Sequence, residues 1–303
     1  MTDAATPGSD AVVSVRDLRK TYGSFLALDG VSFDIHRGET FALLGPNGAG
    51  KSTTIEILEG YRDRTGGEAT VLGIDPHHGG TSWRAQLGIV LQNTGEEGNY
   101  TVHEQLSEFA RYYPNPRDVD EVIASVGLEE KSKTLIRKLS GGQRRRVDVA
   151  LGVIGRPELL FLDEPTTGFD PEARHQFWEL IRRLKAEGTT ILLTTHYLDE
   201  AQQLSDRAGI IAGGKLIEIG NIDEIGGVDA RVPIVRWTGA NGPEEHRTDE
   251  PGAFVAGLMK SGTEPKDLEV VRPSLEDIYL ELVSAYDASI TKVTTKTELE
   301  PVR

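Results

Sequence analysis

The feature that most limits the fold of this chain is a glycine-rich stretch, Gly45–Thr53, which reads GPNGAGKST. An apolar run, Phe41–Leu44, precedes it, and a helix-compatible segment, Thr54–Leu58, follows it. Glycines let the backbone curl so that successive N–H groups face an anion, and a following helix adds the positive end of its dipole. The stretch therefore predicts a strand, a phosphate-binding loop and a helix, with a nucleoside triphosphate as the ligand.

Two side chains of this loop carry chemistry of their own. Lys51 is expected to hold the β- and γ-phosphates by its charge, and the Ser52 hydroxyl is expected to ligate Mg²⁺. The alternative is a glycine-rich turn that matches the spacing by chance, and the apolar run and helix on either side argue against it. The nucleotide-binding residues predicted in the loop are Gly45, Pro46, Asn47, Gly48, Ala49, Gly50, Lys51, Ser52 and Thr53.

The composition argues against several functional classes. The chain has 303 residues, no cysteine and a formal net charge of −15. The lack of cysteine rules out disulfides and thiolate metal sites, and the negative charge argues against binding to nucleic acid. No apolar run approaches the roughly 18 residues of a membrane-spanning helix, and the first ten residues lack the pattern of a signal peptide. We therefore expect a soluble, cytoplasmic protein that meets a membrane only through a partner.

Hydrophobic periodicity predicts an α/β fold that does not begin as a simple alternation of strands and helices. Val31, Phe33 and Ile35 alternate with polar residues, as in a half-buried strand, so antiparallel strands are expected before the loop. Continuous apolar strands are expected at Leu159–Leu162 and Thr190–Thr195. The sequence predicts a nucleotide-binding domain at residues 11–220, with a helical subdomain at about 94–156, and a small accessory domain at 221–286. Flexible tails are expected at residues 1–10 and 287–303.

Two further features narrow the class of nucleotide-binding protein. The strand Leu159–Leu162 ends in Asp163 and Glu164, which are placed to hold the Mg²⁺ shell and to polarise an attacking water. Taken alone, paired carboxylates there are more often a solvated strand end. The run Leu139–Gln143, LSGGQ, predicts a capped helix N-terminus whose glycine N–H groups form a second anion site.

The run LSGGQ resembles the signature motif of the ATP-binding cassette (ABC) ATPases, and the similarity covers about Val13–Ile219 with the motifs in family order. By this resemblance the catalytic residues are Glu164 as general base, His196 as the switch histidine, and Lys51. Phe169 stands where the family more often has leucine, which changes an apolar contact only.

The same resemblance implies the remaining site residues and the cofactors, ATP and Mg²⁺. The implied ligands of Mg²⁺ are Ser52, Gln92 and Asp163. The nucleotide contacts that it adds to those of the loop are Tyr22, which would stack on adenine, Gln92, Ser140, Gly141, Gly142, Gln143 and Asp170.

The resemblance also implies an architecture and partners. It implies an ABC ATPase fold: a P-loop NTPase core with an antiparallel β subdomain and a helical subdomain, here followed by a small C-terminal α/β lobe. Two copies would pack head to tail around two ATP molecules, and a separate transmembrane permease would be the other partner. The protein would then lie on the cytoplasmic face of the cell membrane.

The direction of transport depends on the C-terminal segment. Arg272–Leu280 resembles the tail of the ATP-binding subunits of drug exporters of the daunorubicin-resistance type and of related ABC-2 exporters. Export of a drug, antibiotic or other hydrophobic compound is therefore expected. The alternatives are an importer subunit and a soluble ABC ATPase that acts on ribosomes or DNA. A helix that only closes a small lobe would have the same apolar face.

Three arginines, Arg144–Arg146, follow the signature, and a basic stretch precedes it. We expect a solvated basic face here. The alternative is local attraction of nucleotide or of an acidic loop on a membrane partner.

Overall fold

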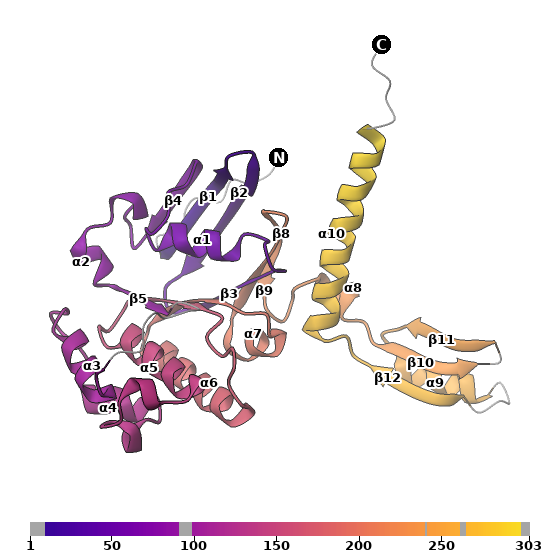
Figure 1. Cartoon of the computed structure of the whole chain (residues 1–303). Helices are drawn as coiled ribbons and strands as arrows, with labels where there is room; N and C mark the ends of the chain where they lie inside the picture. The colour runs from indigo at the N-terminus through magenta and orange to yellow at the C-terminus, as the bar shows by residue number, and fades with distance from the viewer. Residues whose placement is uncertain (1–9, 91–98, 240, 261–264, 298–303) are drawn as a thin grey trace, which may run out of the picture. The chain divides into compact units, whose positions relative to one another are not determined.

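The chain forms two compact units, Met1–Ile222 and Asp223–Arg303 (Figure 1). The structure, a computed structural model, describes residues 10–90, 99–239, 241–260 and 265–297. Within these ranges, no helix is both long enough and apolar enough to cross a membrane.

A six-stranded sheet forms the centre of the first unit, in the order β5-β6-β7-β3-β8-β9. Neighbouring strands are parallel except β9, which pairs antiparallel with β8 at the edge. The five residues of β3 and those of β7 are all buried, which explains why their sequences are apolar runs without alternation. The strands are β3 (Thr40–Leu44), β5 (Leu87–Val90), β6 (Leu159–Asp163), β7 (Thr190–Thr194), β8 (Arg207–Ala212) and β9 (Lys215–Asn221).

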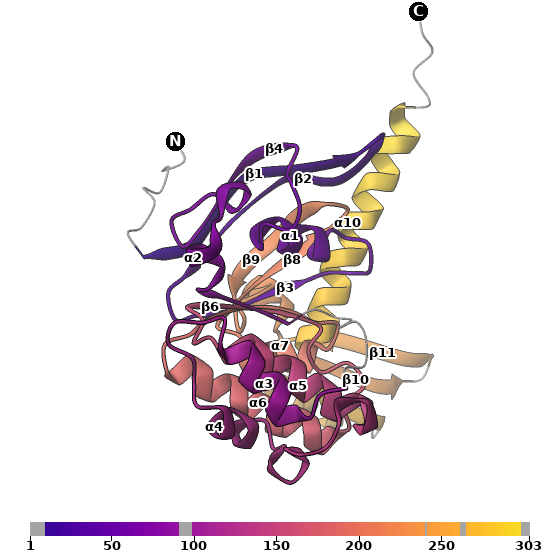
Figure 2. The ribbon, with the colours of Figure 1, turned by 60° about the vertical axis from the view of Figure 1, so that its left-hand side comes forward.

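A second, antiparallel sheet of the first unit has the order β2-β1-β4. Its strands are β1 (Ala11–Tyr22), β2 (Phe25–His36) and β4 (Gly66–Val71). Val31, Phe33 and Ile35 of β2 are buried and alternate with more exposed residues, as the sequence predicts. Figure 2 shows this sheet and helix α1 (Lys51–Leu58) on one side of the central sheet, with the helices α3–α6 on the other.

Two hydrophobic cores lie on the two faces of the central sheet. In β6 and β7, Leu160, Leu162 and Leu193 belong to the core beneath the helices, whereas Phe161 and Leu192 belong to the core beneath the antiparallel sheet. Successive side chains of a strand point to opposite faces, so these two strands contribute to both cores.

The helical region has the boundaries that its capping residues predict. Thr101 and Glu104 form a capping box at the start of α3, and Asp170 caps α6, with Pro171 at its first position. Three short 3₁₀ turns lie at Pro76–His78, Glu129–Lys131 and Ile136–Lys138. The helices are α2 (Thr81–Arg84), α3 (Val102–Ala110), α4 (Val119–Ser125), α5 (Gly141–Val153), α6 (Pro171–Ala186) and α7 (Leu198–Leu204).

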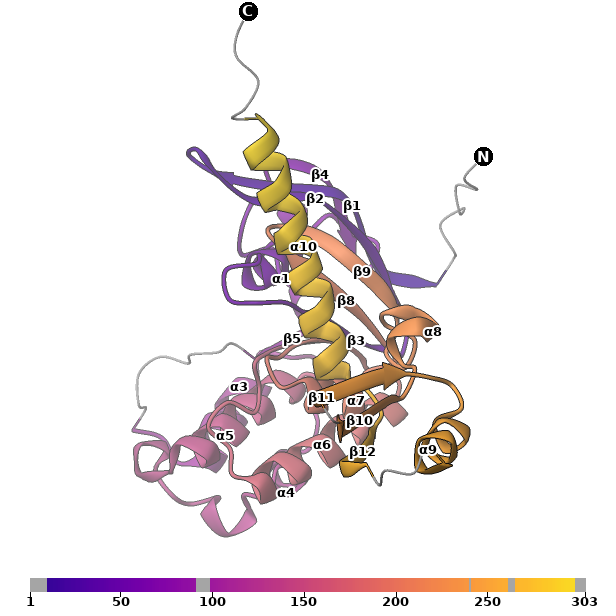
Figure 3. The ribbon, with the colours of Figure 1, turned by 90° about the vertical axis from the view of Figure 1, so that its right-hand side faces the viewer.

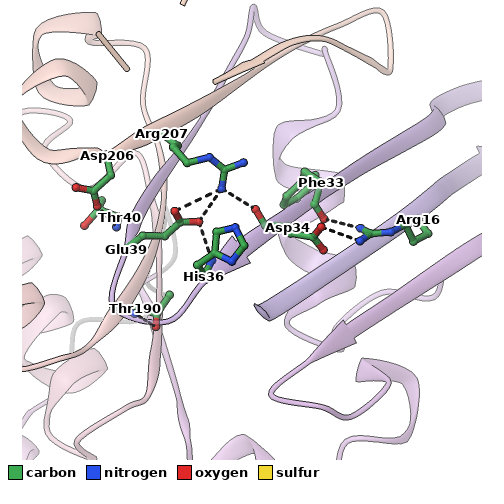
Figure 4. A network of polar contacts seen from close by, with 10 residues as sticks. Arg16, Phe33, Asp34, His36, Glu39, Thr40, Thr190, Asp206 and Arg207 are labelled. Atoms are coloured by element: carbon green, nitrogen blue, oxygen red, sulfur yellow. Dashed lines mark hydrogen bonds and ion pairs between the residues drawn. The ribbon is translucent and has the colours of Figure 1, made fainter. Parts of the chain in front are cut away.

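A polar network joins the two sheets at the start of β3, the end of the strand opposite the glycine-rich loop (Figure 4). Arg207 Nη1 donates to Glu39 Oε1 at 3.1 Å and to the Asp34 carbonyl at 3.2 Å. Arg16 donates to the Asp34 carboxylate at 2.7 Å, and the Thr40 amide donates to Asp206 Oδ2 at 2.9 Å. The network thus ties β1 and β2 to β3 and β8, and it fixes the strand that leads into the loop.

The described residues of the second unit form an antiparallel sheet, β11-β10-β12, and three helices (Figure 3). Ser274 and Asp277 form a capping box: the Ser274 amide donates to Asp277 Oδ2 at 2.8 Å, and the Asp277 amide donates to Ser274 Oγ at 3.2 Å. The elements are α8 (Gly227–Ala230), β10 (Ile234–Gly239), β11 (Gly242–Arg247), α9 (Pro251–Lys260), β12 (Lys266–Val271) and α10 (Leu275–Thr297).

The last helix of this unit extends beyond a predicted boundary. The sequence predicts a flexible tail from residue 287, but α10 continues to Thr297. No glycine or proline interrupts residues 275–297, so nothing in the backbone stops the helix after its first turns. The polar composition that suggested a tail is compatible with an exposed helix.

Candidate nucleotide-binding site

The site forms where three neighbouring parallel strands end. The strand order β6-β7-β3 places the carboxyl ends of these strands on the same edge of the sheet. The loop Gly45–Thr53 follows β3, Asp163 ends β6, and His196 follows β7. Parallel strands deliver residues that are distant in sequence to one edge, which is where α/β folds bind their ligands.

Glycines are required in the loop for two different reasons. Gly48 and Gly50 have φ angles of 78° and 110°, in the left-handed region that favours glycine. A Cβ on Gly45 would lie 2.2 Å from the Ile211 carbonyl oxygen, so the backbone packs too closely there for a side chain. Helix α1 begins at Lys51 without a side-chain cap. The loop therefore leads into a helix N-terminus without a side-chain acceptor, as an anion site requires.

Lys51 lies over this loop and is only 6% exposed. Its Nζ donates to the carbonyl oxygens of Gly45, at 2.7 Å, and Pro46, at 3.1 Å. Burial lowers the pKa of Lys51, while the carboxylates of Glu164 and Asp163 oppose that shift. The ammonium is thus held at the loop and faces the acidic end of β6.

The acidic end of β6 is tied to the end of β7. Asp163 Oδ1 accepts a hydrogen bond from the Thr194 hydroxyl. The Glu164 amide donates to the Thr194 carbonyl at 3.1 Å, and Glu164 Oε2 lies 3.3 Å from His196 Nδ1. Glu164 has a φ of 46°, unusual for a residue with a side chain. The structure therefore brings Lys51, Asp163, Glu164 and His196 together.

Thr194 is a residue of this site that the sequence interpretation missed. It is the last residue of β7, and it stands directly opposite Asp163 in the register of the two strands. The sequence feature that could have indicated its role is a threonine at the end of an apolar strand, two residues before His196.

The oxygen donors at the site fit Mg²⁺. The Asp163 carboxylate and the hydroxyl of Ser52, which is exposed in the first turn of α1, are the hard ligands this ion prefers. Among the described residues, no three His, Cys, Asp or Glu side chains are grouped to hold a metal. Phosphate and water oxygens would complete the coordination, as is usual for Mg²⁺ at a nucleotide. Gln92, the third predicted ligand, lies outside the described residues.

Tyr22 ends β1 and is 39% exposed. The Lys20 ammonium lies 5.1 Å from the centroid of its ring, and the Arg62 guanidinium lies 5.2 Å from it. A partly exposed aromatic ring with cations nearby is suited to contact a nucleotide base next to phosphates.

The signature residues lie in a different part of the first unit. Ser140 and Gln143 form a capping box at the start of α5, with bonds of 3.2 and 3.1 Å between the amide of each residue and the side chain of the other. Helix α5 packs into the core beneath the helices, whereas α1 packs into the core on the other face of the sheet. Among the described residues, no hydrogen bond or ion pair links Ser140–Gln143 to Gly45–Thr53. The two predicted anion sites, the phosphate loop and the N-terminus of α5, are therefore separate from each other within one chain.

Asp170, an implied nucleotide contact, and the neighbouring Phe169 both make contacts within the chain. Asp170 Oδ1 accepts from the Ala173 amide at 2.8 Å, as the cap of α6. Phe169 is 7% exposed and makes an edge contact with Phe177, with 6.0 Å between ring centroids. A Cβ on Gly142 would lie 3.9 Å from the Phe169 ring, so the aromatic side chain fills the space beside the signature.

The expectation of a solvated basic face is wrong for Arg145. This side chain is 7% exposed and donates from Nε to the Pro165 carbonyl at 3.0 Å. Its burial could have been predicted from the helical period, because Arg145 lies on the same helix face as Val149 and Gly152, which follow it by one and two turns and are buried.

Comparisons with known proteins agree with this geometry. The family model described as ABC transporter matches residues 28–167. The Nod factor export ATP-binding protein I of Ralstonia nicotianae is 42% identical over 224 residues, which are 72% of this chain and 70% of that protein. The daunorubicin resistance ATP-binding protein of Streptomyces coeruleorubidus is 33% identical over 304 aligned positions, 90% of this chain and 96% of that protein. A solved ATP-binding subunit of an ABC transporter, 30% identical, superposes with a TM-score of 0.65 over 71% of this chain and 91% of its own.

Proposed function

Because the chain belongs to the ABC transporter family, we propose that it hydrolyses ATP to drive export through a separate membrane protein. The observation that carries the hydrolytic part is the convergence of Lys51, Asp163, Glu164 and His196 at one edge of the central sheet. A cation for the phosphates, a carboxylate for the metal and a carboxylate–imidazole pair for the attacking water are the groups that this reaction needs.

Each residue has a role in the proposed reaction. Lys51 leaves the loop carbonyls and neutralises the β- and γ-phosphates, while the N–H groups at the start of α1 bind their oxygens. Glu164 orients a water molecule and accepts its proton, and His196, 3.3 Å from that carboxylate, contacts the γ-phosphate. Asp163 and Ser52 would hold Mg²⁺, which, when bound, compensates the charge of the phosphates. Tyr22 stacks on the adenine base.

Replacing Lys51 with alanine tests this assignment. Loss of the charge-assisted bonds to phosphate is expected to weaken ATP binding by about 10- to 100-fold. Equilibrium binding of a fluorescent ATP analogue measures the effect. Lys185→Ala, in the last turn of α6, is the matched control and is expected to bind normally. Equal affinity of the Lys51→Ala variant and the wild type would contradict the assignment.

We infer that the working form is a head-to-tail dimer. The helices that follow the phosphate loop and the signature pack on opposite faces of the central sheet, so a second copy is needed to bring the two motifs around one ATP. The Glu164→Gln variant with saturating ATP is therefore expected to elute as a dimer on a sizing column. A second substitution, Gly141→Asp, is expected to return it to the monomer, because the new carboxylate would face phosphate.

The second substitution is suitable because it leaves the chain itself undisturbed. A Cβ on Gly141 meets no atom within 4 Å, so the variant is expected to fold normally. A monomer of Glu164→Gln at saturating ATP would contradict the dimer, and so would a dimer that survives Gly141→Asp.

Export is favoured by similarity over nearly the whole chain. The relative from Streptomyces coeruleorubidus is named for daunorubicin resistance and aligns with 90% of this chain. A second relative, named for Nod factor export, aligns with 72% of it. We propose a drug, antibiotic or other hydrophobic compound as the cargo of a separate permease, with this chain at the cytoplasmic face of the membrane.

Export is tested in the source organism. A Lys51→Ala strain is expected to lose resistance to the exported compound, and the wild-type chain is expected to co-purify with a membrane protein encoded beside it. Co-purification with ribosomes, or a periplasmic binding protein encoded beside the gene, would instead indicate the alternatives.

A further inference from the structure

Two buried ionisable residues, Arg145 of α5 and Glu200 of α7, lie next to the segments that carry Glu164 and His196. Arg145 is 7% exposed, and Glu200 is fully buried. Neither is used in the reaction described above. We propose that Arg145 and Glu200 are positioning residues that hold Glu164 and His196 in their hydrolytic geometry. This inference rests on the proposed function and adds two residues to its site.

Arg145 binds three consecutive carbonyl groups of the segment that carries Glu164. Its Nε donates to Pro165 at 3.0 Å, and its Nη2 donates to Asp163 at 2.8 Å and to Glu164 at 3.4 Å. A planar guanidinium with donors in a fixed fork can hold several acceptors at once in one arrangement. One side chain therefore fixes the backbone on both sides of the Glu164 Cα.

That backbone needs such support. Glu164 has a φ of 46°, in the left-handed region, and a non-glycine residue keeps such a conformation only where its surroundings impose it. The carbonyls bound by Arg145 and the Glu164 amide bound by Thr194 together define this conformation. The conformation in turn directs the Glu164 carboxylate towards His196.

Glu200 supports the other side of the pair. Its Oε1 accepts from Trp178 Nε1 of α6 at 3.3 Å, and its carboxylate lies near the Thr195 hydroxyl. Thr195 directly precedes His196. The Thr195 hydroxyl also accepts a hydrogen bond from the Tyr197 amide at 3.0 Å, which links the residues on either side of His196.

From two helices, the two residues act on the segments that carry Glu164 and His196. Burial lowers the pKa of Arg145, while Asp148, Asp163, Glu200 and Glu164 oppose that shift; burial raises the pKa of Glu200, while hydrogen bonding and Arg174 oppose that shift. A buried charge persists when it has polar partners. The partners of Arg145 belong to the segment that carries Glu164, whereas Glu200 is bonded to Trp178 and lies near Thr195, which precedes His196. Since the described contacts of Arg145 and Glu200 are with protein groups, their removal is expected to change turnover more than ATP affinity.

The experiment measures kcat, KM and equilibrium ATP binding for four variants of the full-length chain. Arg145→Gln is expected to lower kcat by about 10- to 100-fold, as a small misplacement of a general base does, with KM within about threefold of the wild type. Arg145→Lys keeps one donor group and is expected to recover part of the rate. Glu200→Gln, which keeps the shape of the side chain but cannot ionise, is also expected to lower kcat and to leave KM nearly unchanged.

Arg146→Gln is the matched control. It removes the same charge from the next position of the same helix, but Arg146 donates to the Val126 carbonyl at 3.3 Å and not to the Glu164 segment. Its kcat is expected to stay within about twofold of the wild type. Thermal unfolding of each variant shows whether the protein is folded at the assay temperature. If Arg145→Gln does not fold, Arg145→Lys and Glu200→Gln decide the question.

Three results would overturn the inference. The first is a normal kcat in folded Arg145→Gln or, if that variant does not fold, in both Arg145→Lys and Glu200→Gln. The second is a loss of rate that follows only the unfolded fraction, and the third is an equal loss in Arg146→Gln. Failure of the proposed function would look different, because the wild type itself would hydrolyse no ATP in the same assay. The positioning role would then also be contradicted.

Discussion

Replacing Glu164 with glutamine is expected to lower the rate of ATP hydrolysis by about 10²- to 10⁴-fold and to leave ATP bound. The amide keeps the shape of the carboxylate, but it cannot accept a proton from the attacking water. Lys51 and the loop, which would hold the phosphates in the proposed reaction, are not altered. Phosphate release at saturating ATP measures the rate, and equilibrium binding of ATP measures the affinity.

Glu158→Gln is the control for this prediction. Glu158 immediately precedes β6, at the end of the strand opposite Glu164, and pairs with Arg37 at 2.9 Å on the surface. The same chemical change there is expected to leave the rate within about twofold of the wild type, because an exposed ion pair contributes little. Hydrolysis at the wild-type rate by Glu164→Gln would assign the base to another residue.

The stability of the first unit is expected to fall as the pH rises from about 4.5 to about 8, because of Glu59. This residue caps the C-terminal end of α1 and is 7% exposed. Burial, together with the carboxylates of Asp163 and Glu56, raises its pKa from 4.5 to about 8. A carboxyl whose pKa is raised on folding favours the folded state below its unfolded pKa, and this contribution is lost as the pH passes through the folded value.

The full contribution of Glu59 is about 4 to 5 kcal/mol, since one pKa unit corresponds to about 1.4 kcal/mol. Glu59→Gln stays neutral at every pH, so it is expected to be more stable than the wild type above pH 8 and to have a flatter pH profile. Urea unfolding between pH 4 and pH 9, without nucleotide, measures the free energy of unfolding.

Glu68→Gln, at an exposed position of β4, is the control, and it is expected to keep the wild-type pH profile. A Glu59→Gln profile parallel to that of the wild type would mean that the Glu59 carboxyl titrates as an ordinary one.

Much of the fold was predictable because its signals are local. The apolar runs of β3 and β7, the alternation in β2 and the caps at Thr101 and Asp170 each depend on neighbouring residues only. The continuation of α10 to Thr297 was not predicted, because polar composition alone does not separate an exposed helix from a tail without regular structure.

The site was predictable where a motif coincides with a strand end. Lys51, Asp163, Glu164 and His196 meet because β3, β6 and β7 are parallel neighbours, a consequence of topology that the motif order implies. Thr194 and Arg145 were missed because their roles depend on register and on helix packing, which pair residues that are 31 and 18 positions from Asp163. Their sequence neighbours carry no sign of those contacts.

The contribution of β6 and β7 to both cores has a consequence for how the first unit opens. A segment whose side chains alternate between two cores cannot lose its packing on one face without weakening the other. The helices and the antiparallel sheet are therefore not independent foldons: partial unfolding of either reaches the strands that end in the candidate site. Loops at its rim can fluctuate at little cost, but the strand ends that carry Asp163 and His196 are released only when the whole unit unfolds.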